Sequence, residues 1–383
     1  MKKLEKNVPV IRFKGFSEAW EQRKLGKEVE NVATGRSTFF TSIEQSSETP
    51  YAVLGSTSVI SYDKNFDHSG DFILTARVGA NAGNLYKYSG DVKISDNTVY
   101  IQAKSLDFVY YLLNKFDLKR LSFGTGQPLV KASELKNLKL MFPNDEEEQQ
   151  KIGKFFKYLD DAIALHQRKL DALKLMKKGF LQQLFPNNEE KVPRLRFVNF
   201  DGEWEQRELG DLGSVVMNRR IFKEETSYKG EIPFYKIGTF GGVADSYITR
   251  ERFEDYKLKY PYPEKGDVLI SASGSIGRVV EYNGEEAYYQ DSNIVWLKHD
   301  KQLNNLFLKQ FYSIVKWNGI EGTTIKRLYN KNILQTEIKV PGIDEQKRIG
   351  IFFKQFDNNI TRYQSKLEKL SSLKKAYLQR MFI

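Results

Sequence analysis

The stretch EQQKIGKFFKYLD, Glu148 to Asp160, recurs near the end of the chain as EQKRIGIFFKQFD, Glu345 to Asp357. Each residue of the second copy lies 197 positions after its counterpart. From Ile152 and from Ile349, apolar residues follow at alternating steps of four and three, which is the 3.5-residue period of a left-handed coiled coil. The sequence therefore predicts two long helices whose apolar stripes are in register with each other.

Both predicted stripes contain the same kinds of residue at the same steps. We expect the helices to pack on each other antiparallel, with one globular domain at each end; the alternative is that each helix packs only on its own domain. Lys177 and Lys374 interrupt the stripes at the same step, either to tune the register or to extend toward solvent. The seam positions are Ile152, Phe156, Leu159, Ile163, His166, Leu170, Leu173, Lys177, Phe180 and Leu184, then Ile349, Phe353, Phe356, Ile360, Tyr363, Leu367, Leu370, Lys374, Tyr377 and Met381.

A second repeat opens each half of the chain. VPVIRFKGFSEAWEQRKLG, Val8 to Gly26, returns as VPRLRFVNFDGEWEQRELG, Val192 to Gly210. Self-similarity of this kind indicates a tandem duplication. Because Trp20 and Trp204 lie in these matched segments, we expect their rings to be packing anchors and not exposed surfaces that stack on a ligand.

The parts between the matched segments share an order of elements but not a sequence. Runs rich in β-branched and aromatic residues, interrupted by Gly, Asn and Asp, predict strands, and each set is followed by a short apolar helix. We therefore predict an α+β protein with two mixed α/β domains in tandem, each followed by a long helix, arranged with pseudo-twofold symmetry. The predicted boundaries are residues 1–145, 146–186, 187–342 and 343–383.

Composition limits the functions that this chain can have. It holds 60 Lys and Arg against 49 Asp and Glu, a formal charge of +11, which is typical of a nucleic-acid partner or of a lysine-rich solubilising surface. With no cysteine and three histidines, a thiolate metal site is excluded and a zinc site is not expected. No apolar run reaches the length of a signal peptide or of a membrane span, so we expect a cytoplasmic protein.

Sequence motifs of catalysis are missing. The chain has no Pro-Pro or Asn-Pro pair of an amino-methyltransferase pocket and no GxxxxGK[ST] phosphate loop. It therefore reads as a binding protein. Two alternatives stay open: a restriction nuclease with built-in recognition, and an assembly scaffold whose positive charge is incidental.

At this point the chain resembles the specificity subunits of type I restriction–modification enzymes over essentially its whole length. The resemblance lies in the twice-repeated Trp-Glu-Gln-Arg-x-Leu-Gly opening, the two helix starts, and the closing segments Leu175–Gln182 and Leu373–Gln379. It implies two target-recognition domains, each reading one half of a split DNA site, on a helical spacer. It also implies a complex with two methylation subunits and usually two restriction subunits in bacterial defence. S-adenosylmethionine, ATP and Mg²⁺ would belong to those partners, and this chain would be non-catalytic.

Polar and basic residues gather in three loop clusters of each variable domain. Phosphates bind Lys, Arg, Ser and Thr, whereas base edges need donors and acceptors of matching pattern. The alternative is that these loops are ordinary solvated turns. The candidate DNA contacts are Arg36, Ser37, Thr38, Arg77, Asn81, Asn84, Thr125, Gln127 and Lys131 in the first domain, and Arg219, Arg220, Lys223, Ser271, Ser273, Ser275, Arg278, Thr323, Thr324, Lys326 and Arg327 in the second.

Two phenylalanines are candidates for binding a partner protein. Phe155 and Phe352 occupy equivalent positions just off the predicted seams. They either face a methylation subunit or are covered by their own globular domains.

Overall fold

The computed structural model describes residues 7–38, 41–122, 128–187, 189–300, 302–323 and 326–383. The chain divides into two units. The first comprises residues 1–168 and 364–383, and the second comprises residues 169–363. Each unit therefore contains one globular domain, part of helix α4 (Glu146–Leu184) and part of helix α9 (Ile343–Met381).

The globular part of the first unit is built from short strands and helices. Its elements are β1 (Glu21–Lys24), α1 (Leu25–Glu28), β2 (Asn31–Thr34), β3 (Tyr51–Leu54), β4 (Val59–Asp63), β5 (Asp71–Ala76), β6 (Leu85–Ser89), β7 (Val92–Ile94), β8 (Thr98–Gln102), α2 (Leu106–Phe116), the 3₁₀ helix η1 (Leu118–Ser122), α3 (Ala132–Asn137) and β9 (Lys139–Phe142).

The second unit has a similar succession of elements. They are β10 (Glu205–Glu208), α5 (Leu209–Leu212), β11 (Gly213–Val216), the 3₁₀ helix η2 (Lys223–Glu225), β12 (Ile232–Tyr235), β13 (Ser246–Ile248), α6 (Arg250–Lys259), β14 (Val268–Ser271), β15 (Val279–Glu281), β16 (Tyr288–Tyr289), β17 (Ile294–His299), α7 (Asn305–Ile314), α8 (Asn330–Leu334) and β18 (Glu337–Val340).

The two units share one sheet topology. In the first, an antiparallel sheet of order β2-β8-β5-β6 accompanies a mixed sheet of order β4-β3-β7; in the second, the orders are β11-β17-β14-β15 and β13-β12-β16. In each mixed sheet one pair of strands is parallel: β3 with β7 in the first unit, and β12 with β16 in the second. The strands β1·β9 and β10·β18 pair separately, and each brings an opening segment to the strand that precedes a long helix. The predicted duplication is thus a duplication of fold.

The second domain has one insertion that the first domain lacks. Residues 64–70 connect β4 to β5, whereas residues 249–267 connect β13 to β14 and contain α6. The Thr249 hydroxyl caps α6 by accepting a hydrogen bond from the Arg252 amide. Phe253 is the one buried residue of this charged helix, and ion pairs of Arg250 with Glu286 and of Arg252 with Glu225 add polar attachments to the domain.

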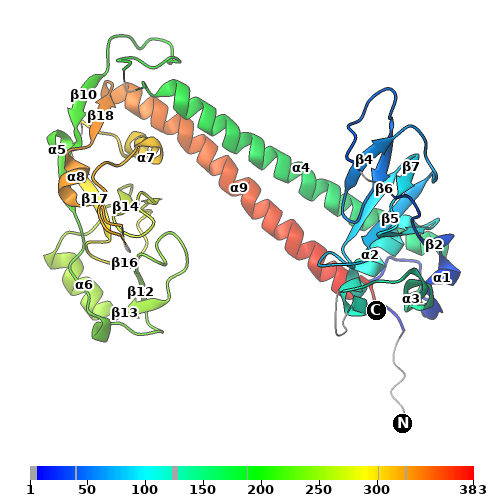
Figure 1. Ribbon diagram of the computed structural model, residues 1–383. Helices are drawn as coiled ribbons and strands as arrows, with labels where there is room; N and C mark the ends of the chain where they lie inside the picture. Colours follow the sequence, from blue (N-terminus) through cyan, green and yellow to red (C-terminus); the bar gives the residue numbers. More distant parts are fainter. Residues whose placement is uncertain (1–6, 39–40, 123–127, 188, 301, 324–325) are drawn as a thin grey trace. The chain divides into compact units, whose positions relative to one another are not determined.

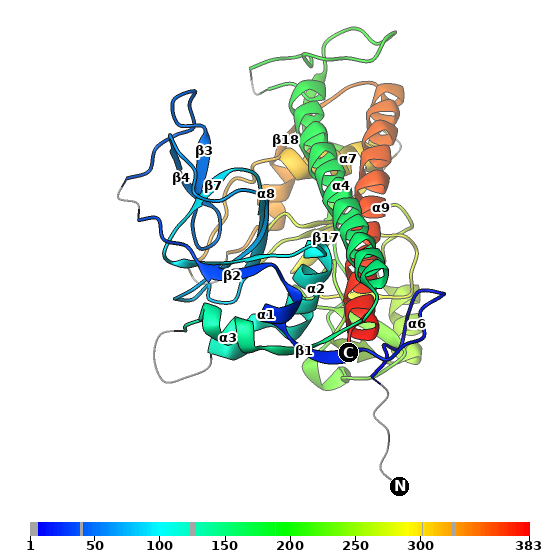
Figure 2. The same cartoon turned by 90° about the vertical axis from the view of Figure 1, so that its right-hand side faces the viewer.

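Alternating residues of the central strand in each domain face two different core clusters. Ile73 on β5 faces the cluster that contains α2, while its neighbours Phe72 and Leu74 face the mixed sheet. In the second domain Ile270 and Leu269 are divided in the same way. Helix α2 lies beside α4 (Figure 2). The α2 side of the first core continues onto α4, because the rings of Tyr111 and Phe156 lie 5.1 Å apart.

Within each unit, α4 and α9 lie side by side and run antiparallel (Figure 1). In the first unit the ring of Phe155 lies 5.1 Å from that of Tyr377, and in the second the ring of Phe180 lies 5.2 Å from that of Phe352. As the residue number rises along α4, that of its contact in α9 falls. All twenty predicted seam positions are buried or half-buried. The predicted coiled coil is therefore confirmed.

No helix among the described residues has the length and apolarity needed to cross a membrane.

Candidate DNA-recognition surfaces

In the first unit, two of the predicted recognition loops meet at the turn Ser95–Asn97, which precedes β8. The Ser37 amide donates to the Ile94 carbonyl at 3.0 Å, and the Asp96 amide donates to the Ser37 carbonyl at 3.2 Å. On the other side, the Arg77 amide donates to the Asn97 carbonyl at 2.9 Å. The loops of Arg36 and of Arg77 therefore flank one turn.

Glycine permits this close approach. A Cβ atom on Gly35 would lie 2.3 Å from the carbonyl oxygens of both Ile94 and Ser95. Any other residue would push the Arg36 loop away from the turn.

The third loop of the first unit pairs with the second. The Val130 amide donates to the Arg77 carbonyl at 2.7 Å, and the Gly79 amide donates to the Pro128 carbonyl at 3.0 Å. Exposed Lys131 follows this contact directly. Thr125 and Gln127, also predicted in this loop, lie outside the described residues.

The second unit repeats this backbone pairing with different side chains. The Ala272 amide donates to the Asn293 carbonyl at 2.7 Å, and the Leu328 amide donates to the Ala272 carbonyl at 2.8 Å. The Gly274 amide donates to the Lys326 carbonyl at 3.0 Å. Ala272 thus takes the place that Arg77 has in the first unit. The hydrogen-bond pattern is kept while the chemistry at its surface changes.

In the second unit, the first loop is joined by an ion pair to the turn Asp291–Asn293, which is equivalent to the turn Ser95–Asn97 of the first unit. Arg220 Nε lies 2.8 Å from Asp291 Oδ2. The hydroxyl of Tyr288 donates to the Arg219 carbonyl at 3.0 Å. Burial raises the pKa of Tyr288, so this hydroxyl keeps its proton. All three predicted clusters of this domain are therefore held around the turn Asp291–Asn293.

Several arginines on these surfaces carry free charge. The guanidinium groups of Arg36, Arg77 and Arg327 are exposed and have no carboxylate partner within the described ranges. In contrast, Arg12 and Arg196 in the scaffold form two-pronged pairs with buried Glu148 and Glu345. Exposed cations without an internal counter-charge suit phosphate binding.

Two of the residues predicted to contact DNA instead form hydrogen bonds that stabilise the loops. Ser271 and Ser273 are buried. The Ser271 hydroxyl donates to the Ser275 carbonyl and accepts from the Arg278 amide at 2.8 Å. The Ser273 hydroxyl donates to Asn293 Oδ1 at 2.6 Å. These two side chains hold the hairpin between β14 and β15 and are not presented to a ligand.

Other predicted residues take part in local contacts at the surface. The Ser37 hydroxyl donates to Asp67 Oδ2 at 2.7 Å, Asn84 Nδ2 donates to Asn81 Oδ1 at 3.1 Å, and Arg278 Nη1 donates to the Phe240 carbonyl at 2.7 Å. Thr324 lies outside the described residues. The remaining candidates are exposed: Thr38, Arg219, Lys223, Ser275, Thr323 and Lys326.

Sequence reasoning missed the central turns. Asp96 and Asn97 are exposed, as is Ser292, which has a φ of 59°. Carboxylate and amide groups can accept from or donate to base edges. The signal was present: SDNTVY and DSNIVW stand at the same point before the last strand of each sheet.

The scaffold fastens each opening segment to its long helix. Trp20 packs edge-on against Phe108 and Phe382, and Trp204 packs in the same way against Phe307 and Phe185. Both indoles are buried, which confirms the expected role of packing anchors.

Phe155 and Phe352 are half-buried by their own units. Phe155 contacts Phe13 at 6.0 Å besides Tyr377, and Phe352 contacts Phe197 at 5.5 Å besides Phe180. Each ring thus joins an opening segment to the helix pair. Most of the surface of both rings is therefore covered by this chain itself, which was the second of the two predicted possibilities.

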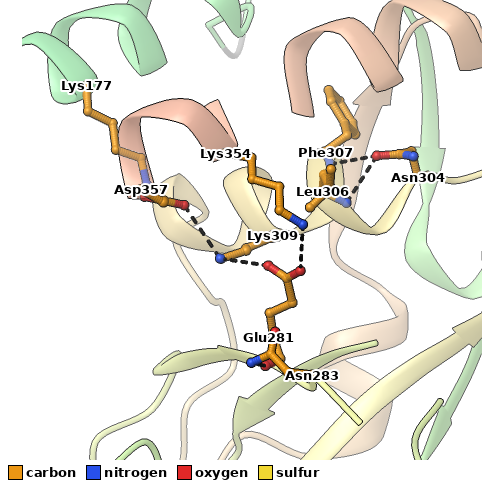
Figure 3. A network of polar contacts seen from close by, with 9 residues as sticks. All are labelled: Lys177, Glu281, Asn283, Asn304, Leu306, Phe307, Lys309, Lys354 and Asp357. Atoms are coloured by element: carbon orange, nitrogen blue, oxygen red, sulfur yellow. Dashed lines mark hydrogen bonds and ion pairs between the residues drawn. The ribbon is translucent and has the colours of Figure 1, made fainter. Parts of the chain in front are cut away.

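A polar network ties the second recognition domain to its helices (Figure 3). Glu281 at the end of β15 accepts from Lys309 on α7 at 3.0 Å and from Lys354 on α9 at 3.3 Å. Lys309 also lies 3.5 Å from Asp357, which pairs with Lys177 on α4 at 2.6 Å. Burial opposes ionisation of Glu281, but the hydrogen bonds and charges of the two lysines outweigh it and lower its pKa.

The first unit uses the opposite charge at the equivalent place. Strand pairing aligns Lys87 on β6 with Glu281, and Lys87 lies 2.6 Å from Asp107 on α2. Tyr111 on α2 donates to Asp160 on α4 at 2.7 Å, and Asp160 pairs with Lys374 on α9. Each recognition domain is therefore attached to the helices by its own set of charges.

Comparison with known proteins agrees with this architecture. The family model for the type I restriction modification DNA specificity domain matches residues 17–175 and 201–371, so both halves and most of the chain are covered. The chain belongs to this family, and the resemblance seen in the sequence is confirmed. It is a specificity subunit: its part in a type I restriction–modification system is DNA recognition, and catalysis belongs to other subunits.

Individual relatives match this chain over most of its length and of their own. A putative type I restriction enzyme specificity subunit of Haemophilus influenzae is 36% identical over 353 residues, covering 89% of each chain. The MjaVIII specificity subunit of Methanocaldococcus jannaschii is 23% identical over 320 residues, covering 78% of this chain and 75% of the relative. The crystal structure of the S subunit from M. genitalium has the same fold, with a TM-score of 0.71 at 16% identity over 98% of this chain and 99% of the other.

Proposed function

We propose that this chain reads a split, asymmetric DNA site, with one recognition domain on each half-site. The observation that carries the proposal is the recognition surface itself. Both domains hold three loops around one turn, and the second and third loops use the same backbone hydrogen bonds in both, yet Arg77 stands where the other domain has Ala272. A palindromic site would require two alike readers. Two unlike readers on one scaffold suit two different half-sites.

The chemistry of the surfaces supports duplex DNA as the ligand. Exposed Arg36, Arg77 and Arg327 supply positive charge for phosphates, and the turn residues Asp96 and Asn97 supply groups for base edges. Phosphate contacts position a protein on the duplex, while base contacts select the sequence.

We further propose that the helix pair docks two methylation subunits, one per repeat, and usually two restriction subunits. The scaffold residues are duplicated, as the pairs Arg12–Glu148 and Arg196–Glu345 show, so two copies of one partner can meet equivalent surfaces. S-adenosylmethionine, ATP and Mg²⁺ would be bound by these partners, which would carry out methylation and cleavage.

Binding of the assembled complex to DNA tests the proposal. The expected result is selective binding to one asymmetric sequence, with an affinity that falls as salt rises by a slope of about 0.9 per neutralised phosphate. Binding that ignores sequence would favour the assembly scaffold instead. Cleavage of DNA by this chain alone with Mg²⁺ would favour the nuclease.

A further inference from the structure

One aromatic side chain is held outward in the first recognition loop of the second unit. Phe222 is 59% exposed, whereas the preceding Ile221 is 8% exposed and belongs to a cluster with Phe234 and Phe253. The loop is thus anchored by one apolar residue and presents the next one to solvent.

The backbone around Phe222 is fixed on both sides. Its amide donates to Glu225 Oε2 at 2.7 Å, and the Glu225 amide donates to the Phe222 carbonyl at 3.0 Å. Glu225 is itself paired with Arg252 on α6. On the other side, Arg220 is bonded to Asp291 of the central turn. A ring on such a loop loses little conformational freedom when it binds a ligand.

Cations flank Phe222 in the sequence. Arg219, Arg220 and Lys223 are all exposed within three positions of Phe222. The Arg219 guanidinium lies over the ring of Tyr260, 5.3 Å from its centroid. An apolar ring between cations matches a duplex, whose phosphates lie on both sides of a stack of bases.

We propose that Phe222 is a specificity-determining residue that inserts as a wedge at one base step of the half-site read by the second domain. This inference rests on the proposed function. Apolar wedges partly unstack a step and bend the duplex. Because pyrimidine–purine steps deform most easily, the wedge selects such a step without a hydrogen bond to it.

The test uses the complex with the methylation subunit and DNA that carries its methylated motif. Phe222→Ala should lower the affinity for this DNA about 5- to 150-fold, the equivalent of about 1–3 kcal/mol of base stacking. The slope of affinity against salt should stay unchanged, because no charge is lost. Lys223→Ala should instead reduce that slope by about one phosphate.

Tyr228 provides the matched control. It lies in the same segment and is 90% exposed, but it follows η2 and lies beyond the loop Arg219–Lys223 that is held to the central turn, so Tyr228→Ala should bind like the wild type. Permanganate should detect an unstacked thymine at one step with the wild-type complex and with Tyr228→Ala, and not with Phe222→Ala.

Three outcomes would overturn the wedge. Phe222→Ala could bind within twofold of the wild type and keep the permanganate signal. It could instead lose the methylation subunit, which would make Phe222 a protein-docking residue. Equal losses for Tyr228→Ala would show a general effect of exposed aromatic residues. A wild-type complex without selective binding would contradict the proposed function itself, before any variant is compared.

Discussion

Lys177 Nζ on α4 lies 2.6 Å from Asp357 Oδ1 on α9, and the equivalent residues Lys374 and Asp160 form the same pair in the first unit. The two lysines are the charged residues of the predicted seams. Their partners lie on the opposite helix and the lysine side chains are half-buried, which favours a role in register over extension toward solvent. An unpaired charge in an apolar seam disfavours every alignment that separates it from its partner.

Exchanging the charges of this pair tests the register. Lys177→Asp should destabilise the second unit by about 1–3 kcal/mol, because a half-buried charge loses its partner and meets a like charge. Adding Asp357→Lys should restore part of the melting temperature, because the exchanged pair re-forms but the new lysine also lies near Lys309. Exposed Lys178→Asp is the neighbouring control. Equal effects at Lys177 and Lys178 would contradict a role in register.

Acid should weaken the attachment of the second recognition domain through Glu281. Because its folded-state pKa is lowered, its contribution to stability is complete above the unfolded pKa of about 4.3 and is lost as pH falls through the lower folded value. The difference in melting temperature between wild type and Glu281→Gln should therefore be largest near neutral pH and shrink below about pH 4. A difference that grows in acid would contradict this assignment.

Docking of the methylation subunit should depend on apolar residues that the helices leave exposed. Met176 and Leu373 are 197 positions apart and are 50% and 42% exposed. Changing both to Asp should abolish co-purification with the methylation subunit while the circular dichroism spectrum stays unchanged. Phe155→Asp and Phe352→Asp would instead disturb each unit internally, because those rings pack against Tyr377 and Phe180. Retained two-to-one assembly of the Met176 and Leu373 variant would exclude this face.

The length of the helix pair should set the gap between half-sites. One heptad inserted after Lys169 and another after Lys366 preserve the seam and lengthen each helix by about 10 Å. At about 3.4 Å per base pair, the unread gap should grow by about three pairs, which also turns one half-site by roughly 100°. Methylation mapping measures the gap directly. An active variant that keeps the original gap would exclude a ruler.

The two long helices and their seam were predictable from sequence, because the same spacing of apolar residues recurs many times along each helix. The seam residues from Ile152 to Met381 repeat one pattern through two helices, and their burial follows it. The short apolar helix predicted after the first set of strands is also present, at Leu106–Phe116. In contrast, α6 was not predicted, because a charged helix with one buried residue, Phe253, has almost no apolar period.

Contacts between loops were beyond the sequence. The pairing of Arg77 with Val130 joins segments about fifty residues apart, and no local pattern encodes it. Serine beside glycine fits a ligand contact or an internal brace equally well, so burial of Ser271 and Ser273 required the fold. The wedge candidate Phe222 was overlooked for a related reason: a single phenylalanine is usually expected in a core.

The central claim is that each recognition domain reads its own half of the site. The most direct measurement replaces residues 25–142 with the equivalent domain of another specificity subunit and maps the methylated motif in the host genome. One half of the motif should change while the other half and the gap are kept. A motif that changes in both halves, or in neither, would contradict it.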